Sequence, residues 1–257
     1  MNTRTRHKTE AIVLRFLDYG ESDRIVTFYT RDYGKIKGIA KGARRSRKRF
    51  ANALELFCFS QIVFSRKGRD SLALLEESRV YHHFENIRQD LEKTLMSSYL
   101  VDLTDQFTLE DKKSTELFQL LHDFLEQING GDSTEALLRF FEIRLLKYAG
   151  YQPVLDRCVG CQAPLNGADV YQFHARAGGI CCGACHRPGE ASLPVSPGTV
   201  KTLLMGRDID LTKMNRLLMS ERSAQESRQM LTHFIRHLLG KELKSHQVLN
   251  QIRKLGL

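Results

Sequence analysis

The hydrophobic pattern of this chain changes its period once, near residue 80, and that change limits the folds open to it. Before the change, short runs rich in β-branched and aromatic residues alternate with turns that contain Gly or Asp, a pattern typical of strands. The runs lie at 11–17, 25–30, 35–40, 56–65 and 72–75. Five short strands in so few residues favour a closed barrel, because closure removes exposed sheet edges. For residues 1–80 we predict a five-stranded barrel of the oligonucleotide-binding (OB) type.

After the change, apolar residues recur near every fourth position, as in amphipathic helices. Three such stretches lie at 87–107, 117–128 and 137–148, and helical spacing resumes after about residue 196. The intervening part has little periodicity. The predicted fold is therefore of the α+β class: an OB-type barrel over 1–80, then a helical domain in two parts, 81–152 and 191–257, with an insert at 153–190.

The insert holds five of the six cysteines. Four of them follow the pattern C-x2-C-x20-C-x2-C, namely Cys158, Cys161, Cys182 and Cys185. Two residues between paired cysteines let one tight turn direct both sulfurs at the same point, and four thiolates satisfy zinc tetrahedrally. A closed shell of four cysteines leaves no position for water or substrate. We therefore predict one structural zinc ion in a zinc ribbon.

Some alternatives to this ligand set stay open from the sequence alone. Cys181 adjoins Cys182 and also fits a C-x3-C pair with Cys185, while His174 and His186 lie close enough along the chain to replace a thiolate. Four buried or redox-active thiols without a metal are a further alternative, although two paired C-x2-C turns are hard to explain that way.

A basic run supplies most of the formal net charge of +9. Residues 35–49 contain eight cations and no acid, namely Lys35, Lys37, Lys41, Arg44, Arg45, Arg47, Lys48 and Arg49. A run of one sign repels itself and typically has an anionic partner, whereas a mixed Lys/Glu run would indicate only solvation. Guanidinium groups bind phosphates bidentately. We therefore predict a mobile, phosphate-binding loop beside the groove of the barrel. Arg4, Arg6 and Lys8 would add to this patch if the N-terminus lies alongside it.

Catalysis is not expected. The sequence has no phosphate-binding loop, dinucleotide fingerprint or hydrolase motif. Asp18, Glu21 and Asp23 form a small acidic cluster that would suit a metal-dependent nuclease, but acids are also common in strand-to-strand turns. No 18-residue apolar run is present, so no membrane span is expected, and we place the protein in the cytosol.

The chain resembles the RecO family of bacterial recombination mediators. Pieces of the resemblance occur in order along nearly the whole sequence: 11–14, 19–23, 40–44, 139–142, 150–151, the cysteine quartet with Gly178 and Gly179, and Leu238 to Ser245. The additional Cys181 departs from a plain quartet, and residues 45–49 match only in being basic.

The resemblance implies binding of single- and double-stranded DNA and annealing of complementary strands. It also implies action with RecR, and with the acidic tail of single-stranded-DNA-binding protein, to load the RecA recombinase, in the bacterial cytoplasm at the nucleoid. Arg139 and Arg144, on the third predicted helix, are candidate contacts for that tail. A zinc-ribbon regulator of transcription or translation is the competing hypothesis.

Overall fold

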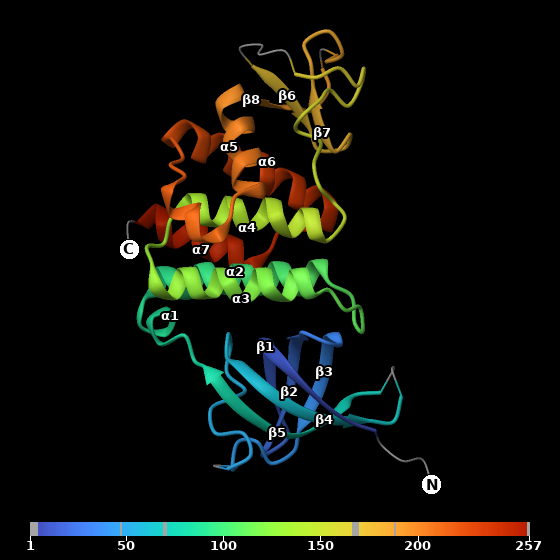
Figure 1. Cartoon of the computed structure of the whole chain (residues 1–257), viewed down its shortest axis with the longest axis vertical. Coiled ribbons are helices and arrows are strands. Elements are labelled where there is room, and N and C mark those ends of the chain that lie inside the picture. The colour runs from blue at the N-terminus through green and yellow to red at the C-terminus, as the bar shows by residue number, and fades with distance from the viewer. Residues whose placement is uncertain (1–4, 47, 69–70, 166–169, 188, 256–257) are drawn as a thin grey trace. The chain divides into compact units, whose positions relative to one another are not determined.

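The computed structural model describes residues 5–46, 48–68, 71–165, 170–187 and 189–255, and it divides the chain into two compact units (Figure 1). The first unit comprises Met1–Asp132 and Val248–Leu257, and the second comprises Ser133–Gln247. The barrel, the three helices that follow it and most of the last helix therefore belong to one unit, and the other helices and the cysteine-rich insert belong to the second.

The first unit begins with a closed five-stranded barrel whose strands lie in the order β1-β2-β3-β5-β4. Its strands are β1 (Thr5–Tyr19), β2 (Asp23–Thr30), β3 (Gly34–Ala40), β4 (Phe59–Arg66) and β5 (Ala73–His82). All neighbours are antiparallel except β3 and β5, which are parallel. This is the topology of the OB barrel, so the predicted fold is confirmed.

The barrel closes because β1 is long enough to pair on both sides. Its first half, from Thr5 to Ile12, pairs with β4, and its second half, from Ala11 to Tyr19, pairs with β2. The register shifts between Val13 and Arg15, and such a bulge bends a strand from one sheet direction into the next.

The barrel core includes three residues from outside the strands, Phe50, Leu54 and Cys58. Thirteen buried residues form it: Ala11, Val13, Val26, Phe28, Ile36, Ala40, Phe50, Leu54, Cys58, Ile62, Phe64, Ala73 and Leu75. Phe50, Leu54 and Cys58 lie in the 41–58 connection between β3 and β4. Their burial anchors the second half of this connection to the barrel.

Three helices complete most of the first unit: α1 (Glu85–Gln89), α2 (Leu91–Phe107) and α3 (Thr115–Gly130). Asp90 caps α2 and Ser114 caps α3, and each side chain accepts a hydrogen bond from a backbone N–H in the first turn. Helix α7 (Lys244–Leu255) ends in this unit, where Arg253 pairs with Glu92 at 2.8 Å.

The helices of the second unit are α4 (Glu135–Tyr148), α5 (Pro197–Asp208) and α6 (Glu221–Leu239), with a 3-10 turn, η1 (Leu211–Arg216). Helix α4 packs against α5 and α6. A side chain at Gly206 of α5 would come within 2.1 Å of the Phe140 ring of α4, so the close crossing of these helices requires glycine.

The cysteine-rich insert forms a three-stranded sheet of β6 (Tyr171–His174), β7 (Gly179–Cys181) and β8 (Leu193–Val195), in the order β7-β6-β8. An edge-to-face contact at 5.5 Å between Phe173 and Phe234 joins this sheet to α6. Together with the cysteine cluster below, this arrangement confirms the predicted α+β fold with an inserted ribbon. The predicted boundary at residue 80 falls inside the first unit, because α1–α3 group with the barrel.

Candidate nucleic-acid interface and metal centre

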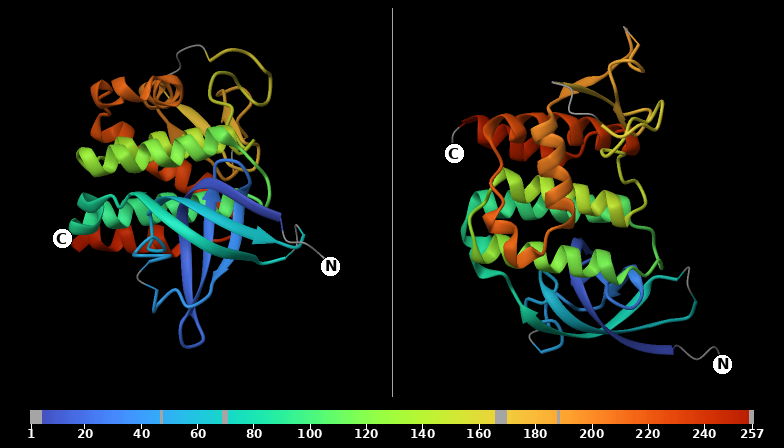
Figure 2. Two further views of the ribbon diagram at one scale, coloured as in Figure 1. Left: turned by 60° about the horizontal axis from the view of Figure 1, so that its bottom comes forward. Right: turned by 45° about the horizontal axis from the view of Figure 1, so that its top comes forward.

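Residues 41–49, hereafter the basic loop, hold most of the predicted phosphate-binding cations. The loop follows β3 directly and packs against the β1–β2 turn: the Arg44 N–H donates to the Ser22 carbonyl at 3.0 Å, and the Gly42 N–H donates to Asp23 Oδ1 at 2.8 Å. Figure 2 shows the β1–β2 hairpin at the end of the barrel away from α2 and α3. Arg4 and Arg47 lie outside the described residues.

The acids of the β1–β2 turn face these arginines. Arg44 lies 3.7 Å from Asp18, and Arg45 lies 3.5 Å from Glu21. Arg24 bonds Asp18 at 2.8 Å and thereby lowers the pKa of that carboxyl. Two of the three acids considered for a nuclease metal, Asp18 and Glu21, therefore contact cations of the protein itself, and the third, Asp23, accepts the Gly42 N–H.

An open hollow of about 700 Å³ lies between the start of β2 and the 41–58 connection, and its lining includes Arg24, Arg44 and Arg45. Its cations come from two segments, β2 and the basic loop, that the barrel brings together. Among the aromatic residues nearby, Tyr19 is 56% exposed at the end of β1. Phe28 and Tyr29 are fully buried and are not available to stack on bases.

Lys35 and Lys37 stand apart from the basic loop because both lie on β3. The Lys35 ammonium donates to the carbonyl and to Oδ1 of Asp105 on α2, at 2.6 and 3.1 Å, and its side chain is only 14% exposed. It fastens the barrel to α2, so its inclusion among the phosphate contacts needs correction. Lys37 is exposed on the same strand.

The far end of the basic loop is fixed to β5. The Ser78 N–H donates to the Arg49 carbonyl at 2.9 Å. Arg49 also donates to the Lys41 carbonyl at 2.9 Å and lies 5.1 Å over the Phe50 ring. Lys48 and Arg49 thus lie beside a different face of the barrel from Arg44 and Arg45.

The second unit contains the candidate metal centre. One ligand atom from each member of the quartet lies within 4.8 Å of the others, namely Cys158, Cys161, Cys182 and Cys185. A side chain at Gly160 would come within 2.9 Å of the Cys185 side chain, so this turn requires glycine. The four cysteines can hold a metal ion.

The surroundings of Cys158 suit a thiolate ligand. Its sulfur accepts the backbone N–H groups of Gly160 and Cys182, each at 3.3 Å. Burial opposes ionisation, but the hydrogen bonds from Cys182, Cys161 and Gly160 outweigh it and lower the pKa of Cys158 to about 6. A thiolate that is stabilised before the metal binds is a good zinc ligand.

The alternative ligands lie outside the cluster of four cysteines. Cys181 is buried in β7 and interacts with Cys158, but it is not one of the four residues whose ligand atoms lie within 4.8 Å of one another. His174 Nε2 lies 3.2 Å from His186 Nδ1, so the two imidazoles contact one another. The geometry therefore selects the four cysteines chosen by spacing.

Arg139 and Arg144, the candidate contacts for an acidic tail, are 1% and 7% exposed. Arg139 pairs with Glu142 at 2.9 Å, and Arg144 donates to the Gly206 carbonyl at 2.9 Å. Neither guanidinium is presented to a partner, and this prediction was wrong. Helix α4 is apolar around most of its circumference, a signal of a buried helix that was available in the sequence.

In the part of the chain that the structure describes, no helix has both the length and the apolar character needed to cross a bilayer.

Two family models together match almost the whole chain. The family model "Recombination protein O N terminal" matches residues 1–84, and "Recombination protein O C terminal" matches residues 88–247. The DNA repair protein RecO of Syntrophus aciditrophicus is 54% identical over 259 residues, covering all of both chains. The DNA repair proteins RecO of Anaeromyxobacter dehalogenans and Bacillus pumilus are 37% and 33% identical, over 97% and 96% of this chain and 98% and 95% of their own.

Proposed function

Because this chain belongs to the RecO family of DNA repair proteins, we propose that it serves recombinational repair by binding single- and double-stranded DNA and annealing complementary strands. The observation that supports this most strongly is the position of the basic loop. It lies against the β1–β2 turn of an OB barrel, and that turn borders the oligonucleotide groove in barrels of this type.

The mechanism is electrostatic. Arginines of the basic loop exchange their carboxylate partners for phosphates, which lowers the repulsion between two strands and lets them approach. Contacts of this kind carry no base readout, so binding is tolerant of sequence. The exposed ring of Tyr19 offers an additional surface for base stacking.

The partners proposed for this function are RecR and the acidic tail of single-stranded-DNA-binding protein, which together with this chain load RecA in the cytoplasm at the nucleoid. Binding the tail would place annealing where single strands are exposed. The tail-binding cations must be ones other than Arg139 and Arg144, because both are buried.

We also propose that the quartet holds one zinc ion. Bound zinc supplies no chemistry to DNA here, since four thiolates complete its coordination. Its role is to join the two C-x2-C turns and so to hold β6 and β7 together.

The test compares an Arg44→Gln/Arg45→Gln variant with Lys201→Gln/Lys241→Gln, which removes the same charge from exposed positions of the second unit. The loop variant should bind a labelled oligothymidylate more weakly and anneal complementary oligonucleotides more slowly than the control. Its log–log salt slope should fall by less than about 0.7 for each lost phosphate contact, because Asp18 and Glu21 already pair with these arginines. Equal binding by the two variants would refute the proposed function.

A further inference from the structure

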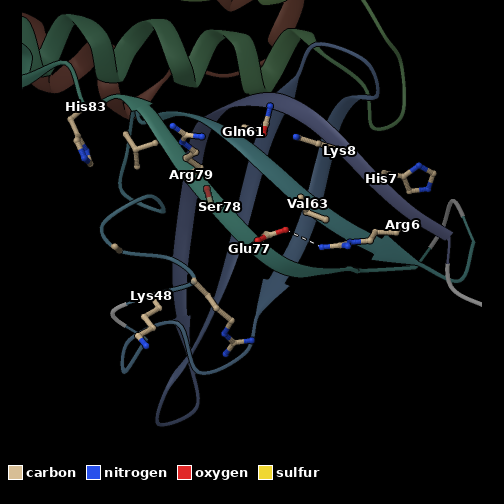
Figure 3. Close-up of a pocket in the computed structure, with 13 residues that line it drawn as sticks. Arg6, His7, Lys8, Lys48, Gln61, Val63, Glu77, Ser78, Arg79 and His83 are labelled. Carbon is tan, nitrogen blue, oxygen red and sulfur yellow. Dashed lines mark hydrogen bonds and ion pairs between the residues drawn. The ribbon is translucent and has the colours of Figure 1, made fainter.

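A second basic groove lies on the outer face of the barrel, over the first half of β1 and over β4 and β5 (Figure 3). It is open, has a volume of about 910 Å³, and is bordered at one end by Lys48 and Arg49 of the basic loop. OB barrels bind oligonucleotides through strands 2 and 3 and the adjoining loops. The groove therefore uses strands that the first site does not.

The register of the strands explains which side chains meet in this groove. Lys8 pairs with Val63, which pairs with Glu77, and in the next row Gln61 pairs with Arg79. Side chains two residues apart along a strand share a face, so these two rows project from the same side of the sheet. Figure 3 shows Lys8, Gln61 and Arg79 arranged along this face.

The groove is strongly positive. Arg6 pairs with both Glu76 and Glu77 at 2.9 Å, so Glu77, an acid that lines the groove, already has a cationic partner. Among the residues that the structure describes, Lys8, Lys48 and Arg79 form no ion pair. These three charges are available to a polyanion.

The floor and rim of the groove favour a single strand. Val63, Val80 and Ala51 give the lining an apolar component. Gln61 donates to the hydroxyl of Tyr81 at 2.7 Å, which brings an exposed aromatic ring beside this lining. Cations that take phosphates and a ring that stacks on bases are the two requirements for binding single strands, whereas the bases of a duplex are already stacked and paired.

The two ends of the basic loop link the two sites. Arg44 is hydrogen-bonded to the β1–β2 turn and Arg49 is hydrogen-bonded to β5, so a loop of nine residues borders both hollows. We propose that the β1–β4–β5 groove binds a second single DNA strand while the β1–β2 turn and the basic loop hold the first. This inference rests on the proposed function, and it supplies the step that annealing needs, two strands held on one barrel.

The test uses a Lys8→Gln/Arg79→Gln variant beside the loop variant and the Lys201→Gln/Lys241→Gln control. Donor- and acceptor-labelled oligothymidylates cannot pair with each other, so energy transfer between them reports two strands on one protein. The groove variant should bind one oligothymidylate within about twofold of the parent but lose energy transfer. Its annealing rate should fall about tenfold or more, as expected when two charge-assisted contacts are lost.

Several results would overturn the inference. If the groove variant has the same energy transfer and the same annealing rate as the parent protein, the groove holds no strand. A loss of single-strand binding equal to that of the loop variant would show one continuous track in place of two sites. Polyglutamate binding that is lost in the groove variant while energy transfer persists would assign the groove to an acidic peptide. The loop variant tests the proposed function separately, because its single-strand affinity is measured without the second strand.

Discussion

The barrel and the ribbon are both small β structures, but different forces hold them together. The barrel has five hydrogen-bonded strands closed around thirteen buried residues. The ribbon has strands of three or four residues, and the sulfurs of its two C-x2-C turns lie within 4.8 Å of one another. A three-stranded sheet of this length cannot bury enough apolar surface to be stable alone. Apolar burial therefore stabilises the barrel, whereas metal coordination should stabilise the ribbon.

Removing the metal should have the largest effect. Apparent binding free energies of structural zinc in small peptides are about 10–16 kcal/mol, so a strong chelator or Cys158→Ser should unfold β6 and β7. Hydrogen exchange should show rapid exchange of amides in the ribbon and unchanged protection in β1–β5. Elemental analysis of the parent should find one zinc per chain. If the amides of the ribbon stay protected from exchange after the metal has been removed, metal coordination does not stabilise the ribbon, and the difference proposed between the two regions is wrong.

Truncating a side chain of the barrel core should destabilise the barrel and leave the metal centre of the ribbon intact. Phe64 is fully buried in the core, so Phe64→Ala should lower the free energy of unfolding of the first unit by about 3–5 kcal/mol. Urea unfolding monitored by circular dichroism measures this loss. The zinc content of the folded protein should stay at the parental value, and a parallel loss of zinc would mean that the two regions depend on each other.

Acid should weaken the helices that carry the ribbon. Burial, aided by Arg139, lowers the pKa of His246 to about 4, whereas an unfolded histidine titrates near its ordinary value of 6.5. Below pH 6.5 His246 is protonated in the unfolded chain but stays neutral in the folded chain. The free energy of unfolding therefore decreases as the pH falls from 6.5 to 4. The loss should be about 3 kcal/mol.

The measurement for His246 is thermal unfolding of the second unit across that pH range, with zinc release recorded in parallel because ligand protonation also removes metal. A His246→Gln variant removes the titrating group, so its unfolding should depend less on pH over this window. An identical pH dependence in the variant would assign the effect to the metal centre.

A smaller effect should follow from crowding the first cysteine turn. In Gly160→Ala the new methyl group meets the Cys185 side chain, so the turn must shift, with a cost of about 1–3 kcal/mol. Competition with a chromophoric chelator should show weaker metal binding. Gly183→Ala is the matched control, because a side chain there meets no atom within 4 Å.

The smallest effect on stability should come from the basic loop. Arg44→Gln/Arg45→Gln changes exposed positions, so the melting temperature should correspond to a change within about 0.5 kcal/mol. A large loss of stability would show that the ion pairs with the β1–β2 turn support the barrel, and the reduced DNA binding of this variant would then have to be reinterpreted.

The sequence predicted the features that depend on local pattern. Strand and helix periods identified the barrel and α2–α4, and spacing alone identified the four cysteines that the fold brings together. Spacing suffices for the cysteines because each pair is set by one short turn.

Features set by long-range contacts were not predicted. Lys35 resembles its basic neighbours in sequence, yet its partner Asp105 lies 70 residues away. Arg139 and Arg144 resemble surface charges until α5 and α6 cover the helix. The second groove was missed because its cations come from β1, β5 and the basic loop, and only the barrel register brings them to one face.

The carboxylates of the β1–β2 turn act as resident counter-ions for the basic loop. An arginine that faces Asp18 or Glu21 holds fewer mobile anions, and a carboxylate displaced by phosphate attracts cations from the solution. Association with DNA then releases fewer ions in total than the charge of the loop implies, and the salt dependence of affinity becomes correspondingly shallow. The affinity of this protein for DNA should therefore persist over a wider range of ionic strength than that of a protein whose equally charged loop has no acids beside it.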